Sequence, residues 1–365
     1  MKEEYTLKKL LISDSPIKKI VRSPDYNFDF DKKTGMFVRW GKTFEDDPTK
    51  APAPEILDLE ISYGPCSQHC EFCYKENGSG DLHNMTFDEF KNIFDKMPKI
   101  LTQIAFGITD IYTNPDFFKM MEYARQNGVI PNYTTSGFDL DEDAVKKTKE
   151  LCGAVAVSIH NKEKAFNAIK AFTDAGMTQV NVHWVLMEEN YDETFKIINE
   201  LTSDPRTSKL NAFVMLAYKD KGAGKGHFHS IHSVEKYRKL IDYCESKKIG
   251  YGFDSCSAPV FFKSLEGTDR YEKISMLGEA CESTLFSSYI NADGKFFPCS
   301  FNEDEGIEGL DVLNCEDFSR DIWMHESTRK FREKLLNTTS GCSGCPSQKF
   351  CRSCPTFEVT TCHKT

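Results

Sequence analysis

Short apolar segments alternate with amphipathic segments through the middle of the chain. The apolar runs predict buried strands at residues 56–63, 100–108, 129–134, 154–159, 179–187, 212–218 and 249–253. The segments between them have apolar residues at helical spacing, and they predict helices at 87–97, 117–127, 141–151, 162–175, 192–201 and 234–247. Cap residues precede several of these helices: Thr86, Asp139 or Asp141, and Ser233. This alternation predicts an α/β fold with parallel strands, and the number of repeats favours a partial (β/α)6 barrel.

Residues 1–55 do not follow this pattern. Within them, residues 29–41 predict two short strands joined at Lys33, Thr34 and Gly35, and residues 43–55 form a proline-rich acidic linker. Residues 219–226 are glycine-rich and predict a flexible loop after the sixth strand, without the spacing of a P-loop. We therefore expect three units: an N-terminal extension and linker at 1–55, a barrel at 56–255 and a cysteine-rich domain at 256–365.

The charge balance and the hydropathy exclude some functions. The chain has 46 Lys and Arg against 56 Asp and Glu, a net charge of −10, which argues against a nucleic-acid-binding surface over the whole molecule. No apolar run approaches the roughly 20 residues of a membrane span, and the N-terminus lacks the features of a signal peptide. We therefore expect a cytoplasmic protein, whose 14 cysteines are reduced and serve first as metal or cluster ligands.

Three of these cysteines directly follow the first predicted strand. Cys66 and Cys70 are separated by three residues, and Cys70 and Cys73 by two. Three thiolates are one ligand short of a closed tetrahedral metal site or of an ordinary [4Fe–4S] cluster, so one position stays open for a substrate or a cofactor. The alternative is a zinc knuckle completed by His69 or by a distant ligand.

A second series of cysteines lies in the tail. Twelve residues separate Cys281 from Gly294, and four separate Gly294 from Cys299. The series continues with Cys342, Cys345, Cys351 and Cys354, at gaps of two, five and two, and ends at Cys362. So many soft thiolates favour iron–sulfur clusters or zinc, and a zinc ribbon at residues 342–354 is the alternative. We expect the isolated Cys152, Cys244 and Cys315 to be inert thiols.

The first motif, CxxxCxxC with the aromatic Phe72 before its last cysteine, resembles the signature of radical S-adenosylmethionine (radical SAM) enzymes. In that family the open iron binds S-adenosylmethionine, and its reductive cleavage gives a 5′-deoxyadenosyl radical that abstracts hydrogen from a substrate. The family's Gly-Gly-Glu-Pro segment is altered here, and Asp110 stands where its acid would meet the cofactor's amino group. The resemblance further implies that Ser136, Ser158 and Asn190 contact the cofactor after the third, fourth and fifth strands.

The tail resembles the SPASM extension of the same family, although two residues rather than three separate Cys351 from Cys354. This extension implies two auxiliary [4Fe–4S] clusters, so three clusters in total. The distal cluster would be held by Cys342, Cys345, Cys351 and Cys362. The nearer cluster would be held by Cys281, Cys299 and Cys354, with Cys256 as the candidate fourth ligand. Without Cys256, that cluster would have an open iron.

The resemblance implies a radical SAM/SPASM oxidoreductase, most of all one that oxidatively modifies a peptide or protein, by a crosslink or a similar change. It also implies an external electron donor of the flavodoxin or ferredoxin type. The residue after Cys299 is Ser300, where sulfatase activators carry an aspartate base, so that subclass is disfavoured and the catalytic base is unknown. Two alternatives stay open: a radical dehydrogenase or related enzyme for a sugar or nucleoside, and an iron–sulfur scaffold without radical chemistry.

Overall fold

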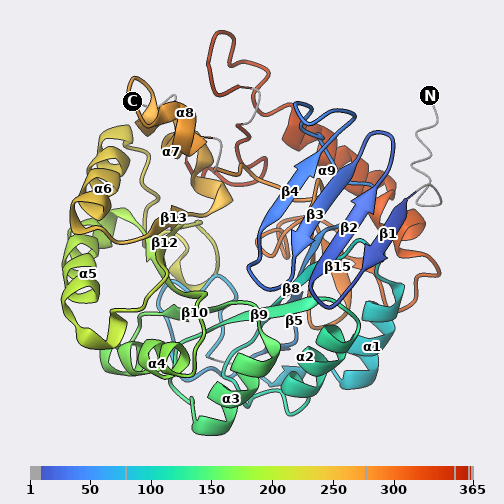
Figure 1. Ribbon diagram of the computed structural model, residues 1–365, viewed down its shortest axis with the longest axis horizontal. Coiled ribbons are helices and arrows are strands. Elements are labelled where there is room, and N and C mark those ends of the chain that lie inside the picture. Colours follow the sequence, from blue (N-terminus) through green and yellow to red (C-terminus); the bar gives the residue numbers. More distant parts are fainter. Residues whose placement is uncertain (1–9, 79, 276–277, 349–350, 361, 363–365) are drawn as a thin grey trace.

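Parallel strands and helices alternate through the middle of the chain, in a computed structural model that describes residues 10–78, 80–275, 278–348, 351–360 and 362 (Figure 1). The strands are β5 (Ile56–Glu60), β8 (Gln103–Gly107), β9 (Ile130–Thr135), β10 (Val155–Ser158), β11 (Val180–Leu186), β12 (Ala212–Ala217) and β13 (Tyr251–Phe253). The helices are α1 (Phe87–Lys96), α2 (Phe117–Gln126), α3 (Glu142–Leu151), α4 (Lys162–Asp174), α5 (Tyr191–Ser203) and α6 (Val234–Lys247). The predicted strands and helices of this region are confirmed to within a few residues at their ends.

The strands lie side by side in the order β13-β12-β11-β10-β9-β8-β5, and each neighbouring pair is parallel. The helices cover the outside of this curved sheet (Figure 1). Within the described residues the sheet is open, because β13 has a partner on one side only. The architecture is the partial (β/α)6 barrel that the sequence predicts, with one further strand.

The helix starts agree with the chemistry of their caps. Thr86 forms a capping box with Glu89, and the side chains of Asp141 and Ser233 accept backbone N–H groups of α3 and α6. Asp139, the other cap candidate, instead accepts a hydrogen bond from the backbone N–H of Tyr112 at 3.2 Å.

The C-terminal part of the chain extends the barrel sheet. Strand β14 (Ser287–Ile290) pairs with β5 in parallel, and β15 (Lys295–Phe297) and β16 (Leu310–Asp311) continue the sheet in antiparallel fashion. The helices of this part are α7 (Ala258–Leu265), α8 (Tyr271–Ser275) and α9 (Glu326–Leu336), with a π-helical turn at Ser319–Trp323. The cysteine-rich tail is thus hydrogen-bonded through β14 to the first strand of the barrel.

The N-terminal residues form a separate antiparallel sheet, which lies beside α9 (Figure 1). Its strands are β1 (Leu11–Asp14), β2 (Lys18–Arg22), β3 (Asn27–Asp31) and β4 (Phe37–Trp40), in that order. The predicted hairpin is confirmed as β3–β4, whereas β1 and β2 were not predicted. Val21, Phe28 and Phe30 are buried in one apolar cluster with Ile100 and Ile130, which lie just before β8 and at the start of β9. The sheet therefore covers the amino-terminal end of the barrel strands.

A two-stranded ribbon, β6 (Ser62–Tyr63) and β7 (His83–Asn84), follows β5 at the opposite end of the barrel. It brings together the two ends of the loop that carries Cys66, Cys70 and Cys73. Parallel barrels carry their chemistry at this carboxyl-terminal edge. No helix within the described residues is long and apolar enough to cross a membrane.

Candidate active site

The loop between β6 and β7 brings three thiols close together. Cys66, Cys70 and Cys73 are free and half-buried, and the Cys73 N–H donates to the Cys70 carbonyl at 3.1 Å. Burial, followed by the nearby thiols of Cys73 and Cys66, raises the pKa of Cys70 to about 12. Burial also raises the pKa of Cys66. These thiols bind a metal or a cluster in their thiolate form, after they have lost their protons. Thiolates are the usual ligands of iron–sulfur clusters, so this set of three donors fits such a group.

Asp110 lies beside this loop with one oxygen free. Its Oδ2 accepts hydrogen bonds from the backbone N–H of Ser67 at 2.9 Å and from the Ser67 hydroxyl at 2.6 Å. Its Oδ1 is buried and has no partner among the described residues. A buried carboxylate oxygen without a partner is costly, so it fits a missing donor such as the ammonium of S-adenosylmethionine. The predicted role of Asp110 toward that cofactor stays a prediction.

Two rings pack against the loop. Phe72 lies 5.8 Å from the ring of His160, centroid to centroid, and 6.3 Å from the ring of Phe228. The Nε2 of His160 is 3.4 Å from the Sγ of Cys70. Burial lowers the pKa of His160, which favours the neutral imidazole. His160 follows β10, so the aromatic contact joins the cysteine loop to the fourth strand of the barrel.

The glycine-rich loop after β12 also packs against the cysteine loop. The N–H of Ala223 donates to the Cys73 carbonyl at 2.9 Å. A Cβ on Gly222 would lie 2.3 Å from that same carbonyl oxygen, and one on Gly224 would lie 3.0 Å from the Cα of Phe72. The sequence predicted a flexible loop here, but the structure gives its glycines a specific packing role. The density of glycine was the signal, because glycine permits such close backbone approach.

The other predicted cofactor contacts have local roles. The Ser136 hydroxyl accepts a hydrogen bond from the N–H of Phe138 at 3.3 Å. The amide of Asn190 donates to the Val185 carbonyl at 2.8 Å and accepts the Met187 N–H at 3.0 Å, which closes the turn after β11. Ser158 ends β10, and in the parallel register it lies opposite His183 of β11. The roles of Ser136, Ser158 and Asn190 toward S-adenosylmethionine stay predictions.

The structure brings four tail cysteines into one group. Burial and the neighbouring thiols of Cys362, Cys345 and Cys342 raise the pKa of Cys351 to about 12. Burial and the thiols of Cys342 and Cys345 likewise raise the pKa of Cys362. These are the four residues predicted to hold the distal cluster. Their ligand role itself stays a prediction.

A second group contains the other four candidate ligands. Burial and the thiols of Cys281 and Cys354 raise the pKa of Cys256, and the same two thiols act on Cys299, whose pKa burial raises to about 12. Burial raises the pKa of Cys281 to about 11. Cys256 therefore lies among the residues of the nearer predicted cluster, although it is 25 residues before Cys281 in the sequence.

The zinc alternatives require ligands that converge on a single ion. Within the described part of the chain, no three His, Cys, Asp or Glu side chains lie close enough together to hold one metal ion. A four-iron cluster separates its thiolate ligands more widely than one tetrahedral zinc ion does.

A buried polar network joins the cysteine loop to the tail. Lys75, two residues after Cys73, lies 3.1 Å from a carboxylate oxygen of Glu60 and 2.9 Å from the Tyr289 hydroxyl, and it also pairs with Glu303. Burial raises the pKa of Glu60, against the lowering effect of Lys75. Sequence reasoning did not single out these residues. The only signal was an acid at the end of the first strand.

Further charged groups lie near the second cysteine group. Lys219 forms an ion pair with Asp254 at 2.5 Å, and both side chains are largely buried. His183 is hydrogen-bonded to Thr134 at 3.2 Å, and burial lowers its pKa to about 4, so it is neutral at physiological pH. Both His183 and Asp254 thus have a polar partner in the structure.

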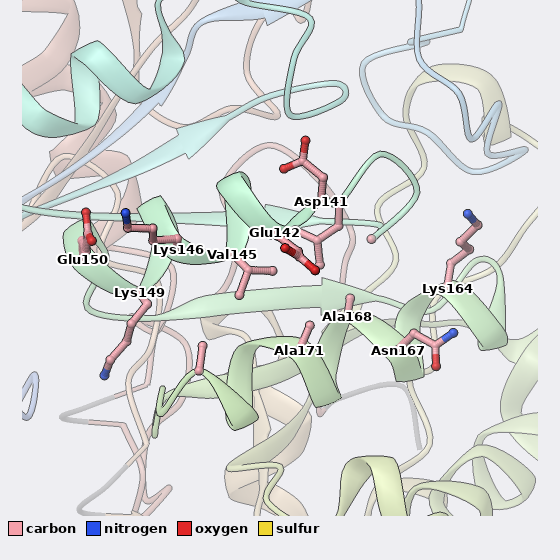
Figure 2. A pocket seen from close by; sticks show the side chains of 13 residues that line it. Asp141, Glu142, Val145, Lys146, Lys149, Glu150, Lys164, Asn167, Ala168 and Ala171 are labelled. Carbon is pink, nitrogen blue, oxygen red and sulfur yellow. The ribbon is translucent and has the colours of Figure 1, made fainter.

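An open groove of about 690 Å³ lies elsewhere, on the outer helices (Figure 2). It runs between α3 and α4, and its floor is formed by small and apolar side chains such as Val145, Ala168 and Ala171, with lysines and acids at its rim. None of the candidate cofactor or cluster residues lines it. The groove is therefore separate from the candidate site.

Comparison with known proteins agrees with this geometry. The Radical SAM superfamily matches residues 61–161. A probable GTP 3′,8-cyclase of Saccharolobus solfataricus is 21% identical over 79% of this chain and 92% of its own length. A tungsten-containing aldehyde ferredoxin oxidoreductase cofactor-modifying protein of Pyrococcus furiosus is 28% identical over 27% of this chain and 28% of its own.

Among solved structures, Streptococcus suis SuiB bound to precursor peptide SuiA superposes with a TM-score of 0.73 at 11% identity, over 97% of this chain and 100% of that chain. Native anSMEcpe with bound AdoMet and Cp18Cys peptide gives 0.60 at 14% identity, over 83% of this chain and 89% of that chain. At these identities the likeness concerns the fold. The matched residues 61–161 include the three-thiol loop, and the thiol-rich tail follows the barrel as the SPASM pattern requires. Residues 61–161 of this chain thus match the Radical SAM superfamily, and the chain as a whole shares the fold of these two structures.

Proposed function

We propose that this enzyme oxidatively modifies a peptide or protein through radical chemistry. The observation that carries the proposal is the arrangement around the cysteine loop: three neighbouring thiols, one ligand short of closure, beside an aspartate oxygen that has no partner among the described residues. S-adenosylmethionine, when bound there, supplies a 5′-deoxyadenosyl radical as the hydrogen-abstracting group. An external donor of the flavodoxin or ferredoxin type would provide the electron, in a cytoplasmic setting where the thiols stay reduced.

The residues of this chain have distinct proposed tasks. Cys66, Cys70 and Cys73 hold the first cluster, and Asp110 accepts the cofactor's ammonium through Oδ1 while Ser67 orients it through Oδ2. Phe72, whose ring packs against His160 and Phe228, would lie beside the bound cofactor. Because the loop is braced by the glycine-rich segment after β12, its thiols are held in position before the cofactor binds.

We propose two further clusters, making three in all. The distal one uses Cys342, Cys345, Cys351 and Cys362, and the nearer one uses Cys256, Cys281, Cys299 and Cys354. The grouping of the thiols, four by four, supports this division. With Cys256 as a ligand, both clusters are closed, so neither offers an open iron to the substrate.

A peptide substrate is favoured by two similar structures. The structures of SuiB and anSMEcpe are described with bound peptides. The second candidate is a small molecule such as a nucleoside or nucleotide, which is favoured by the similarity to probable GTP 3′,8-cyclases. A triphosphate, however, needs unpaired basic groups, and two lysines near the cysteine groups, Lys75 and Lys219, are already paired with carboxylates.

The decisive test of radical chemistry replaces Cys66, Cys70 and Cys73 with alanine. Anaerobically reconstituted wild type should contain about 12 irons and release deoxyadenosine from S-adenosylmethionine with dithionite, whereas the triple variant should keep about 8 irons and release none. Cys152→Ala, a buried thiol outside the cysteine groups, is the control. Undiminished release from the triple variant would end the proposal, and wild type that binds iron but releases none would favour a scaffold.

The substrate class needs a separate test. Open reading frames beside the gene that encode a short peptide would favour peptide modification. When the enzyme is coexpressed with that peptide, mass spectrometry should show a peptide mass lowered by the loss of hydrogen atoms. The peptide coexpressed with the triple variant should keep its original mass. Consumption of a nucleotide in place of the peptide would favour the small-molecule candidate.

A further inference from the structure

The inner face of the barrel sheet is accessible to water at Asp58. Along β5 the side chains alternate: Leu57 and Leu59 are buried against the helices, whereas Asp58 is exposed on the opposite face. The same alternation occurs in β11 and β12, whose helix-facing residues are buried and whose inward residues are partly exposed. Asp58 therefore points to the concave side of the sheet, in the middle of the first strand.

The Asp58 carboxylate has no partner there. Among the described residues, no side chain forms a hydrogen bond or an ion pair with it. In the register of the sheet it lies between Ala105 of β8 and Tyr289 of β14, with Glu60 one step along the same face. Although water reaches it, the surrounding barrel raises the pKa of Asp58 to about 6. A nearby cation would favour the charged form of Asp58 and offset this effect.

The charged groups around Asp58 make the region negative. Glu60 and Glu303 share the single ammonium of Lys75, which leaves one negative charge in excess. Tyr74 lies near enough for the Asp58 charge to contribute to its raised pKa, and burial keeps Tyr74 neutral. Together with Asp58, these groups attract a cation and repel an anion.

We infer that Asp58 binds a cationic group of the substrate, an ammonium or a guanidinium, on the inner face of β5. This inference rests on the proposed peptide-modifying function and adds a substrate class to it: a peptide that presents a basic side chain beside the residue to be modified. Asp58 is eight residues from Cys66 in the sequence and belongs to the same strand-and-loop unit. It is thus a substrate-binding residue, which sets specificity.

The test uses two peptide probes of equal shape: acetyl-Gly-Lys-Gly-amide and its norleucine counterpart, which lacks the charge. Dissociation constants are measured by saturation-transfer NMR on reconstituted enzyme with S-adenosylmethionine at pH 7.5. Wild type should bind the lysine probe at least about fivefold more tightly, and Asp58→Asn should abolish this difference. The control is Asp143→Asn, which removes an exposed carboxylate from α3 and should leave the preference intact.

The outcomes are separable. An unchanged preference in Asp58→Asn, or no preference in wild type, would overturn the inference. Iron content and S-adenosylmethionine binding, measured on the same preparations, establish that the Asp58 variant is folded and loaded. If wild type instead failed to release deoxyadenosine but kept the lysine preference, the proposed function would fail while the cation site remained.

Discussion

Gly222→Ala tests whether the glycine-rich loop positions the cysteine loop. Gly222 has φ +69°, a conformation that costs an L residue about 1–2 kcal/mol. Gly226, in the same loop, has φ +75° but no atom within 4 Å of its Cβ position. The two alanine variants therefore share the backbone cost, and only Gly222→Ala adds a steric overlap.

That overlap is large. The new Cβ would lie 2.3 Å from the Cys73 carbonyl oxygen and 2.6 Å from the Tyr74 Cα, where ordinary contacts begin at 3.4 Å. The cysteine loop must therefore move by about 1 Å, and a displacement of this size at a reacting centre can cost roughly a hundredfold in rate.

The assay is the rate of deoxyadenosine release by reconstituted protein, together with iron content and thermal unfolding. We expect Gly222→Ala to lose at least about tenfold in rate, and Gly226→Ala to stay within about twofold of wild type. Equal rates for the two variants would refute the reasoning, because the close approach to Cys73 would then have no influence on the site.

Three further predictions follow from single residues. Asp110→Asn should weaken S-adenosylmethionine binding at least about tenfold by calorimetry, since a charge-assisted contact is lost while Ser67 keeps its partner; an unchanged dissociation constant would place Asp110 outside the site. Phe90→Ala should lower the free energy of unfolding in urea by about 3–5 kcal/mol because this ring is fully buried, whereas exposed Phe138→Ala should cost little; similar losses would contradict the packing argument. Because the pKa of Asp58 is raised to about 6 in the folded protein, it contributes a fall in wild-type stability as pH rises from 4 towards 7, and Asp58→Asn should make this decline shallower in thermal unfolding; parallel pH profiles would refute it.

The barrel was predictable from the sequence because its signals are local. Strands such as β11 are short apolar runs, and caps such as Thr86 and Asp141 lie next to the helices that they start. The composition of the cysteine groups followed from the spacing of a known motif, which is again a property of the chain alone. In the same way, the hairpin β3–β4 was indicated by a turn at Gly35.

What the sequence could not indicate depends on contacts between distant segments. The pairing of β14 with β5, the position of Glu303 beside Lys75 and the packing of Gly222 on Cys73 each join residues far apart in the chain. The unpartnered state of Asp58 is also invisible in the sequence, since a strand residue gives no sign of which groups will surround it.

The pairing of β14 with β5 bears on how the protein is made. During translation β5 emerges more than 200 residues before its partner, so its free edge is exposed until the ribosome has synthesised the segment around Ser287. Such long-range pairing slows folding and leaves an edge open to association with other chains. The barrel sheet therefore gains its β14 partner only after most of the chain has been synthesised.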